Sequence, residues 1–250
     1  KAITDNYGQG RWGMDIKEDL GGGLNANARV EFAFRAGTGT ADAAREQWVG
    51  LSSKSWGSAK FGRVQSVLKD FAGGGGLDPF GGTALQARGS GGAQYAPGNG
   101  FGAASHVDHA IRYDSPNFSG FSAAVLWMPS DATQAAAGGG GNTGGKGGAN
   151  DIQLGLKYKF GKAGEIFGGY SVDNASDAQR AAVHNGRTGD DEKVWRLGAS
   201  WSFGNLKIAG QYEDIESALL TGGSTCSGGS SGSGNEAAPS AQCLTALNTN

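Results

Sequence analysis

A strict two-residue alternation of apolar and polar side chains constrains this chain more than any other feature. Between Leu24 and Arg35 one parity is wholly apolar, whereas the other is polar or charged except at Ala33. Successive side chains of a strand point to opposite faces, so this period predicts strands with one apolar and one polar face. The pattern predicts ten strands of about 7–12 residues, the length of tilted membrane strands: Gly10–Glu18, Leu24–Arg35, Arg45–Ser53, Ser58–Val64, Val107–Tyr113, Phe121–Met128, Asp151–Phe160, Glu165–Val172, Val194–Phe203 and Asn205–Ile215.

Short and long connections alternate along the chain between these strands. In an up-and-down barrel every second connection falls at the same rim, so the tight turns gather at one end and the long loops at the other. A Greek-key sandwich does not sort its connections in this way. The short connections are 19–23, 54–57, 116–120, 161–164 and 204, and the long ones are 37–44, 65–106, 129–150, 173–192 and 216–250. We therefore predict an all-β fold, a transmembrane antiparallel up-and-down β-barrel, as one domain over residues 1–250.

Composition and residue spacing argue against other classes of protein. No apolar run reaches the roughly 18 residues that a membrane-spanning helix needs. The net charge is −2, which argues against nucleic acid as a partner. The histidines lack metal-like spacing, so neither a metal nor a cofactor is predicted. No convergent nucleophile and base set is found, so we predict no catalytic residues and no enzyme activity.

Aromatic residues and cysteines add two expectations. Nine aromatic side chains sit on the apolar parity, mostly near strand ends, as in the girdles of membrane barrels: Trp12, Trp48, Tyr113, Trp127, Tyr158, Tyr170, Trp195, Trp201 and Phe203. Cys226 and Cys243 are the only cysteines and share one Gly/Ser-rich stretch. We expect a disulfide between them, which suits an oxidising compartment; two free thiols are the alternative.

Four motifs, in order and with the right spacing, resemble the general Gram-negative porin family over about Gly8 to Ile215. They are Gly10-Arg11-Trp12-Gly13 followed by Lys17–Leu24, then Phe61-Gly62-Arg63, then Asp78-Pro79-Phe80-Gly81-Gly82, and finally Ile111–Phe121.

The resemblance implies a sixteen-stranded homotrimeric porin in the bacterial outer membrane, exported through the periplasm and in contact with the lipid bilayer and lipopolysaccharide. Ten predicted strands make this chain resemble a fragment of such a barrel, incomplete at both ends. Residues 65–106 would fold into the lumen as the constriction loop, and residues 216–250 would form a long external loop.

The resemblance also implies a constriction between basic wall residues and acids. Motif positions assign Arg11, Arg63 and His106 to the basic side, and Glu31, Asp78 and Asp70 to the acidic side. A histidine is mostly neutral at pH 7, and Pro79 stands where the family has its tip glutamate, so both sides depart from the pattern. Strand parity adds three further charged residues to the constriction: Arg29, Arg112 and Asp108.

Counting all charges on the polar parity predicts an excess of basic residues. Eleven are basic: Arg11, Lys17, Arg29, Arg35, Arg45, Arg63, Arg112, Lys157, Lys159, Arg196 and Lys207. Six are acidic: Asp15, Glu31, Asp108, Asp151, Glu165 and Glu213. Such an excess in a narrow conduit concentrates anions. We predict a general diffusion pore for small polar or anionic solutes, with modest anion preference unless the charges pair with each other.

Two other functions stay open. A substrate-specific outer-membrane channel would need an aromatic slide or a dedicated site, but the polar parity is mostly charged or small. A soluble or surface β-domain that binds a partner or glycan would place the apolar face in a core.

Overall fold

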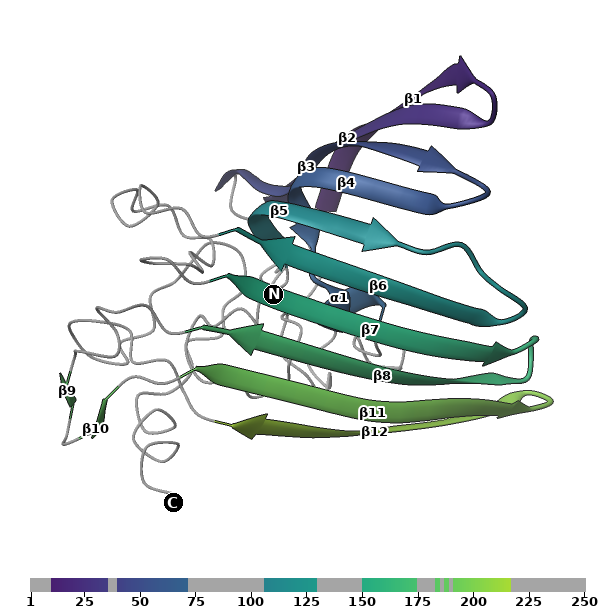
Figure 1. Ribbon diagram of the computed structural model, residues 1–250, viewed down its shortest axis with the longest axis vertical. Helices are drawn as coiled ribbons and strands as arrows, with labels where there is room; N and C mark the ends of the chain where they lie inside the picture. Colours follow the sequence, from purple (N-terminus) through teal and green to yellow (C-terminus); the bar gives the residue numbers. More distant parts are fainter. Residues whose placement is uncertain are drawn as a thin grey trace, which may run out of the picture.

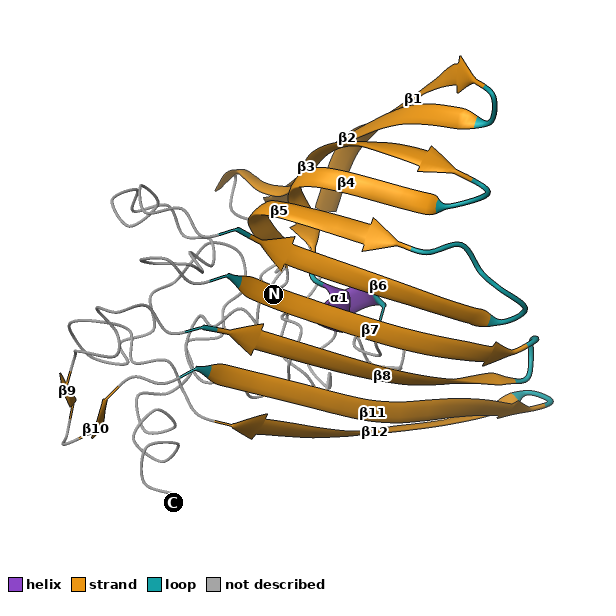
Figure 2. Cartoon of the chain, viewed as in Figure 1, coloured by secondary structure: helices purple, strands orange, loops and turns teal. Residues whose placement is uncertain are grey.

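The computed structural model describes residues 10–35, 40–71, 106–129, 150–174, 183–184, 187–188 and 191–216. Ten antiparallel strands of this part form one curved sheet, and one short helix lies against it (Figures 1 and 2). The sheet strands are β1 (Gly10–Gly21), β2 (Leu24–Arg35), β3 (Thr40–Ser53), β4 (Gly57–Gln65), β5 (His106–Asp114), β6 (Phe121–Met128), β7 (Asp151–Phe160), β8 (Gly164–Asp173), β11 (Glu192–Phe203) and β12 (Leu206–Glu216). The helix is α1 (Val67–Asp70), and β9 (Val183–His184) pairs separately with β10 (Arg187–Thr188).

Strand order confirms the predicted up-and-down topology. Each strand of the ten-stranded sheet is hydrogen-bonded to the next one along the chain, and β1 and β12 are its edges. The five short connections lie at one end of the sheet, on the right in Figure 1. The first of them turns through Gly21, Gly22 and Gly23, all with positive φ, which glycine adopts without a steric penalty.

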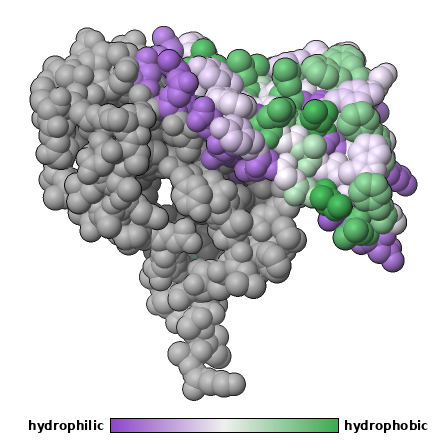
Figure 3. Space-filling model, turned by 90° about the horizontal axis from the view of Figure 1, so that it is seen from below, coloured by the Kyte–Doolittle hydropathy of each residue, from purple (hydrophilic) through white to green (hydrophobic). Residues whose placement is uncertain are grey.

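The two faces of the sheet differ as the alternation predicts. We call the face that carries α1 the inner face and the opposite one the outer face. Large apolar side chains stand exposed on the outer face; Trp12 and Leu197, for example, are each 53% exposed. In Figure 3 such hydrophobic side chains (green) gather over the strands, away from the residues drawn in grey. Polar side chains such as Gln153 and Arg196 are instead buried on the inner face.

An apolar cluster also lies on the inner face, between α1 and strands β4 to β6. It comprises Val64, Val67, Val107, Ala110, Ala124, Leu126 and Met128, with Trp48 and Phe71 packed against it. The core of the described part is therefore the contact between the helix and the wall, and not a layer between two sheets.

Several element boundaries differ from the prediction. β1 runs on to Gly21, and β3 already begins at Thr40, because residues 40–44 pair with β2 beyond a bulge. The helix α1 and the β9–β10 hairpin fall inside connections that were predicted without structure. Among the described residues no helix is long and apolar enough to cross a bilayer. The predicted disulfide Cys226–Cys243, the loop 216–250 beyond Glu216 and Asp78 lie outside the described residues.

Candidate functional site: the inner wall and its helix

Three strands hold α1 against the inner face through hydrogen bonds to two of its backbone groups and to one of its side chains. The Val67 amide donates to Gln153 Oε1 on β7 at 2.8 Å. The Arg196 guanidinium on β11 donates to the Leu68 carbonyl oxygen at 2.5 Å. The Asp70 carboxylate accepts from Arg112 Nη1 on β5 at 2.9 and 3.0 Å. Side chains of the wall thus satisfy backbone groups that a helix this short leaves unpaired.

The wall packs closely against the apolar side of the helix. Leu126 and Met128 of β6 point inward and are almost fully buried. On β7, a Cβ added at Gly155 would lie 2.7 Å from both Phe71 Cδ1 and Val67 Cγ1. Only glycine lets the helix approach the wall this closely. A weak signal for this site existed in the sequence, since the polar parity of Phe121–Met128 carries Ala124, Leu126 and Met128 instead of charges.

The contact at Gly155 gives a testable prediction. Gly155→Ala should displace α1 from the wall, because the new methyl group overlaps Phe71 and Val67, and overpacking typically costs about 1–3 kcal/mol. We expect faster amide hydrogen exchange over residues 67–71. Gly168→Ala is the matched control, because the nearest atom to its added Cβ lies 3.6 Å away. An unchanged exchange rate in Gly155→Ala would show that the close approach is dispensable.

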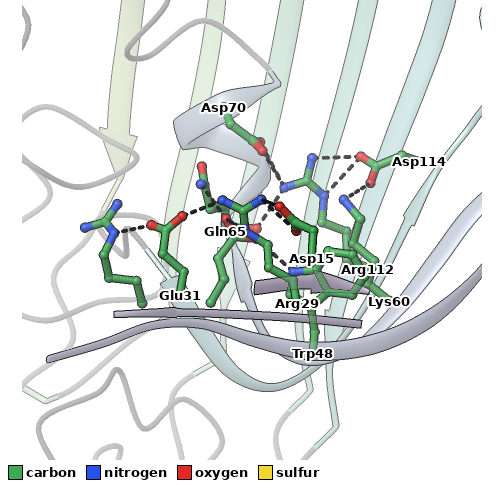
Figure 4. Close-up of polar contacts among 11 residues, drawn as sticks. Asp15, Arg29, Glu31, Trp48, Lys60, Gln65, Asp70, Arg112 and Asp114 are labelled. Carbon is green, nitrogen blue, oxygen red and sulfur yellow. Dashed lines mark hydrogen bonds and ion pairs between the residues drawn. The ribbon is translucent and has the colours of Figure 1, made fainter. Parts of the chain in front are cut away.

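A network of ion pairs spans β1 to β3 on the inner face. Arg29 lies at its centre and bonds Asp15 at 3.0 Å, Glu46 at 3.3 Å and Glu31. Arg45 Nε bonds the other oxygen of Glu31 at 2.5 Å. Figure 4 shows Asp15 and Glu31 of this network reaching toward Arg29. The structure thus brings together the predicted pair Arg29 and Glu31.

A bulge explains why sequence parity missed part of this network. The β2–β3 register shifts between Val30 and Phe32, so that Arg45 and Glu46 both face Glu31 from the opposite strand. Glu46 accepts hydrogen bonds from Trp48 Nε1 and Gln65 Nε2, each at 2.9 Å. Trp48 therefore lies on the inner face, and its predicted place in the outer aromatic girdle is wrong. The other eight aromatic residues of that set are exposed.

A second charged group lies where β5 meets α1. Arg112 is 4% exposed, and its side chain bonds Asp70, Asp114 and the Gln65 carbonyl oxygen. Lys60 bonds the second oxygen of Asp114 at 3.1 Å. Burial raises the pKa of Asp70, against the lowering effect of the neighbouring Arg112 charge. Of this group the sequence predicted Arg112 and Asp70, whereas Lys60 and Asp114 were missed.

The remaining predicted residues lie at the edge of these groups. The charges of Arg45 and Glu31 both act on the Arg11 guanidinium. Arg63 bonds Asp108 at 2.6 Å beside a bulge in the β4–β5 pairing. His106 is buried, and the positive charges of Arg63 and Arg45 act on its imidazole ring. All predicted constriction residues except Asp78 thus belong to the described wall or to its helix.

Sequence and fold comparisons agree on one family. The chain matches the family described as Gram-negative porin over residues 1–241. It is 30% identical over 214 residues to an outer membrane porin protein of Bordetella pertussis, covering 81% of this chain and 51% of that protein. It is 28% identical over 185 residues to the major outer membrane protein P.IB of Neisseria meningitidis serogroup B, covering 72% of this chain and 49% of that one. The chain thus spans about half the length of these curated relatives.

A solved structure shares the fold. The anion-selective porin from Comamonas acidovorans superposes with a TM-score of 0.61 at 24% sequence identity. The match covers 82% of this chain and 57% of that one.

Proposed function

This chain belongs to the Gram-negative porin family, and we propose that the protein that carries it forms a general diffusion pore in the bacterial outer membrane. The pore would pass small hydrophilic solutes and ions passively, with a modest preference for anions, and no residue would have a catalytic role. One observation carries this proposal: the exposed face of the sheet is apolar, whereas its charged side chains lie on the face that holds α1. Lipid tails suit the first face and an internal column of water suits the second.

The constriction in this proposal consists of α1 and the charged wall opposite. Arg29, Glu31, Asp70 and Arg112 contribute fixed charges at short range. Arginine suits this role because it stays charged at all relevant pH values and is held in place by carboxylates. A hydrated ion passes such a wall without forming a covalent bond, so size and charge decide its rate.

We further propose that the protein is a homotrimer embedded in lipid and lipopolysaccharide, as the family resemblance implies. Its aromatic outer side chains, among them Trp127 and Trp195, would lie toward the membrane interfaces. The proposed sign of ion selectivity is that of the Comamonas acidovorans porin, which is described as anion-selective.

Currents across planar lipid bilayers test the proposed pore. We expect single-channel steps in KCl, channels that close in equal steps with one step per protomer, and a reversal potential in a salt gradient that reports anion preference. Saturation of the current by one solute at low concentration would instead favour a substrate-specific channel. Clear cation selectivity would contradict the proposed preference.

A further inference from the structure

Most described arginines of the inner wall are compensated by carboxylates; the exception is Arg11, which is exposed on β1 and forms no ion pair with a described residue. Each of the five arginines with an ion pair in the described residues contacts at least one acid at 3.3 Å or less: Arg29, Arg45, Arg63, Arg112 and Arg196. Some of these arginines contact more than one acid: Arg29, for example, contacts Asp15, Glu31 and Glu46. A passing anion would therefore meet pairs of opposite charge at these positions, and the net attraction of a pair falls off quickly with distance.

Four lysines on the same face are arranged differently. Lys17, Lys157, Lys159 and Lys207 form no ion pair with any described residue. All four lie close to the short connections: Lys157 and Lys159 precede the turn after β7, Lys17 precedes the turn after β1, and Lys207 follows the turn before β12.

These lysine side chains point toward the inner face, as their contacts and their neighbours along and across the strands show. Lys157 Nζ lies 4.8 Å from the centre of the Phe71 ring, directly beside α1. Lys207 lies between Leu206 and Ile208, which are exposed on the outer face. Lys17 likewise follows the exposed Ile16 and is paired with Asn27.

The wall around these lysines carries little negative charge. Lys157 is paired with Ser122, and Lys207 with Ser202. The acids near these lysines are Glu165, which pairs with Lys159, Asp70, whose charge acts on Lys157, and Asp19, which lies two residues from Lys17 and accepts a hydrogen bond from the Gly21 amide. Lys157 and Lys159 also lie within electrostatic range of each other. Among the described residues, the short-turn half of the inner wall therefore carries more basic than acidic side chains outside ion pairs: four lysines against Glu165 and Asp19.

We propose that these lysines, and not the arginines beside α1, set the anion preference of the pore. Small inorganic and carboxylate anions would be concentrated at Lys157 and Lys159, next to the constriction on its short-turn side. Lys17 and Lys207 would extend the positive wall toward the rim. This inference rests on the proposed pore function and adds to it the residues that decide ionic selectivity.

Reversal potentials in a KCl gradient test the assignment. The double variant Lys157→Gln/Lys159→Gln should lower the anion-to-cation permeability ratio by about fourfold, since one unit charge at the edge of a water-filled path changes it by about twofold. Arg45→Gln/Glu31→Gln removes one ion pair of the constriction without changing the net charge, and we expect it to change the ratio less than the lysine variant does. Lys54→Gln removes one lysine from a short turn and should have little effect.

The measurements separate two kinds of failure. If the unmodified protein prefers cations, the proposed anion preference falls, and with it this inference. If the unmodified protein prefers anions but the lysine variant keeps its ratio, the pore assignment stands and the assignment to lysines is overturned. A larger fall in the permeability ratio in Arg45→Gln/Glu31→Gln than in the lysine variant would show that the arginine network, and not the lysines, sets the selectivity.

Discussion

Leu197→Arg is expected to lower the free energy of unfolding by about 2–4 kcal/mol in lipid vesicles, the usual cost of a charge on the lipid face near the bilayer midplane. Leu197 lies at the centre of β11 and is 53% exposed on the outer face. The proposed barrel places this side chain among lipid tails, where a guanidinium has neither water nor a carboxylate to bond. Urea titration of the vesicle-bound protein, followed by tryptophan fluorescence, measures the change.

The matched control introduces the same charge on the opposite face. Ala209 of β12 is exposed and is paired with Ser200, which lies on the inner face. Ala209→Arg should alter the free energy of unfolding by no more than about 0.5 kcal/mol, because the new charge remains in water. Equal costs at the two positions, or a larger cost at Ala209, would reverse the assignment of the faces and favour a soluble β-domain.

Arg112→Met is expected to lower the free energy of unfolding by about 2–3 kcal/mol and to loosen α1. Breaking a fully buried ion pair typically costs about 3–5 kcal/mol, and the partial exposure of Asp70 and Asp114 reduces that cost. Methionine keeps much of the side-chain volume but leaves Asp70 and the Gln65 carbonyl oxygen without their donor. Amide hydrogen exchange over residues 67–71 and the noise of the open-channel current report the loosening.

Lys60→Met is the control for the second variant. Lys60 also bonds Asp114 but has no bond to the helix, so its loss leaves Arg112 bonded to both carboxylates. We expect a cost of at most about 1 kcal/mol, as for a partly exposed ion pair, and unchanged exchange in α1. Protection of α1 that survives in Arg112→Met would mean that Gln153 and Arg196 hold the helix without help.

The sequence alone determined the fold class, the ten strands and, except around Glu46 and Trp48, which side chains face each way. It could do so because period two is a property of the backbone of each strand and needs no knowledge of the neighbours. The alternation of short and long connections was equally local, since it placed all tight turns at one end before any pairing was known. Arg29, Glu31, Asp70 and Arg112 could be assigned to the site from parity and motif for the same reason.

Only the tertiary structure decided which charges meet and where the helix rests. Arg45 joins Glu46 on the inner face because a bulge between β2 and β3 changes the register, and a bulge cannot be recognised from the local sequence pattern. Arg196 bonds Leu68 across 128 positions of the chain, a contact that exists only once the sheet has curved around α1. Pairing between strands also decided that Arg29 and Arg196 lie opposite acids whereas Lys157 and Lys207 lie opposite serines, because a residue's partner depends on register and its face only on parity.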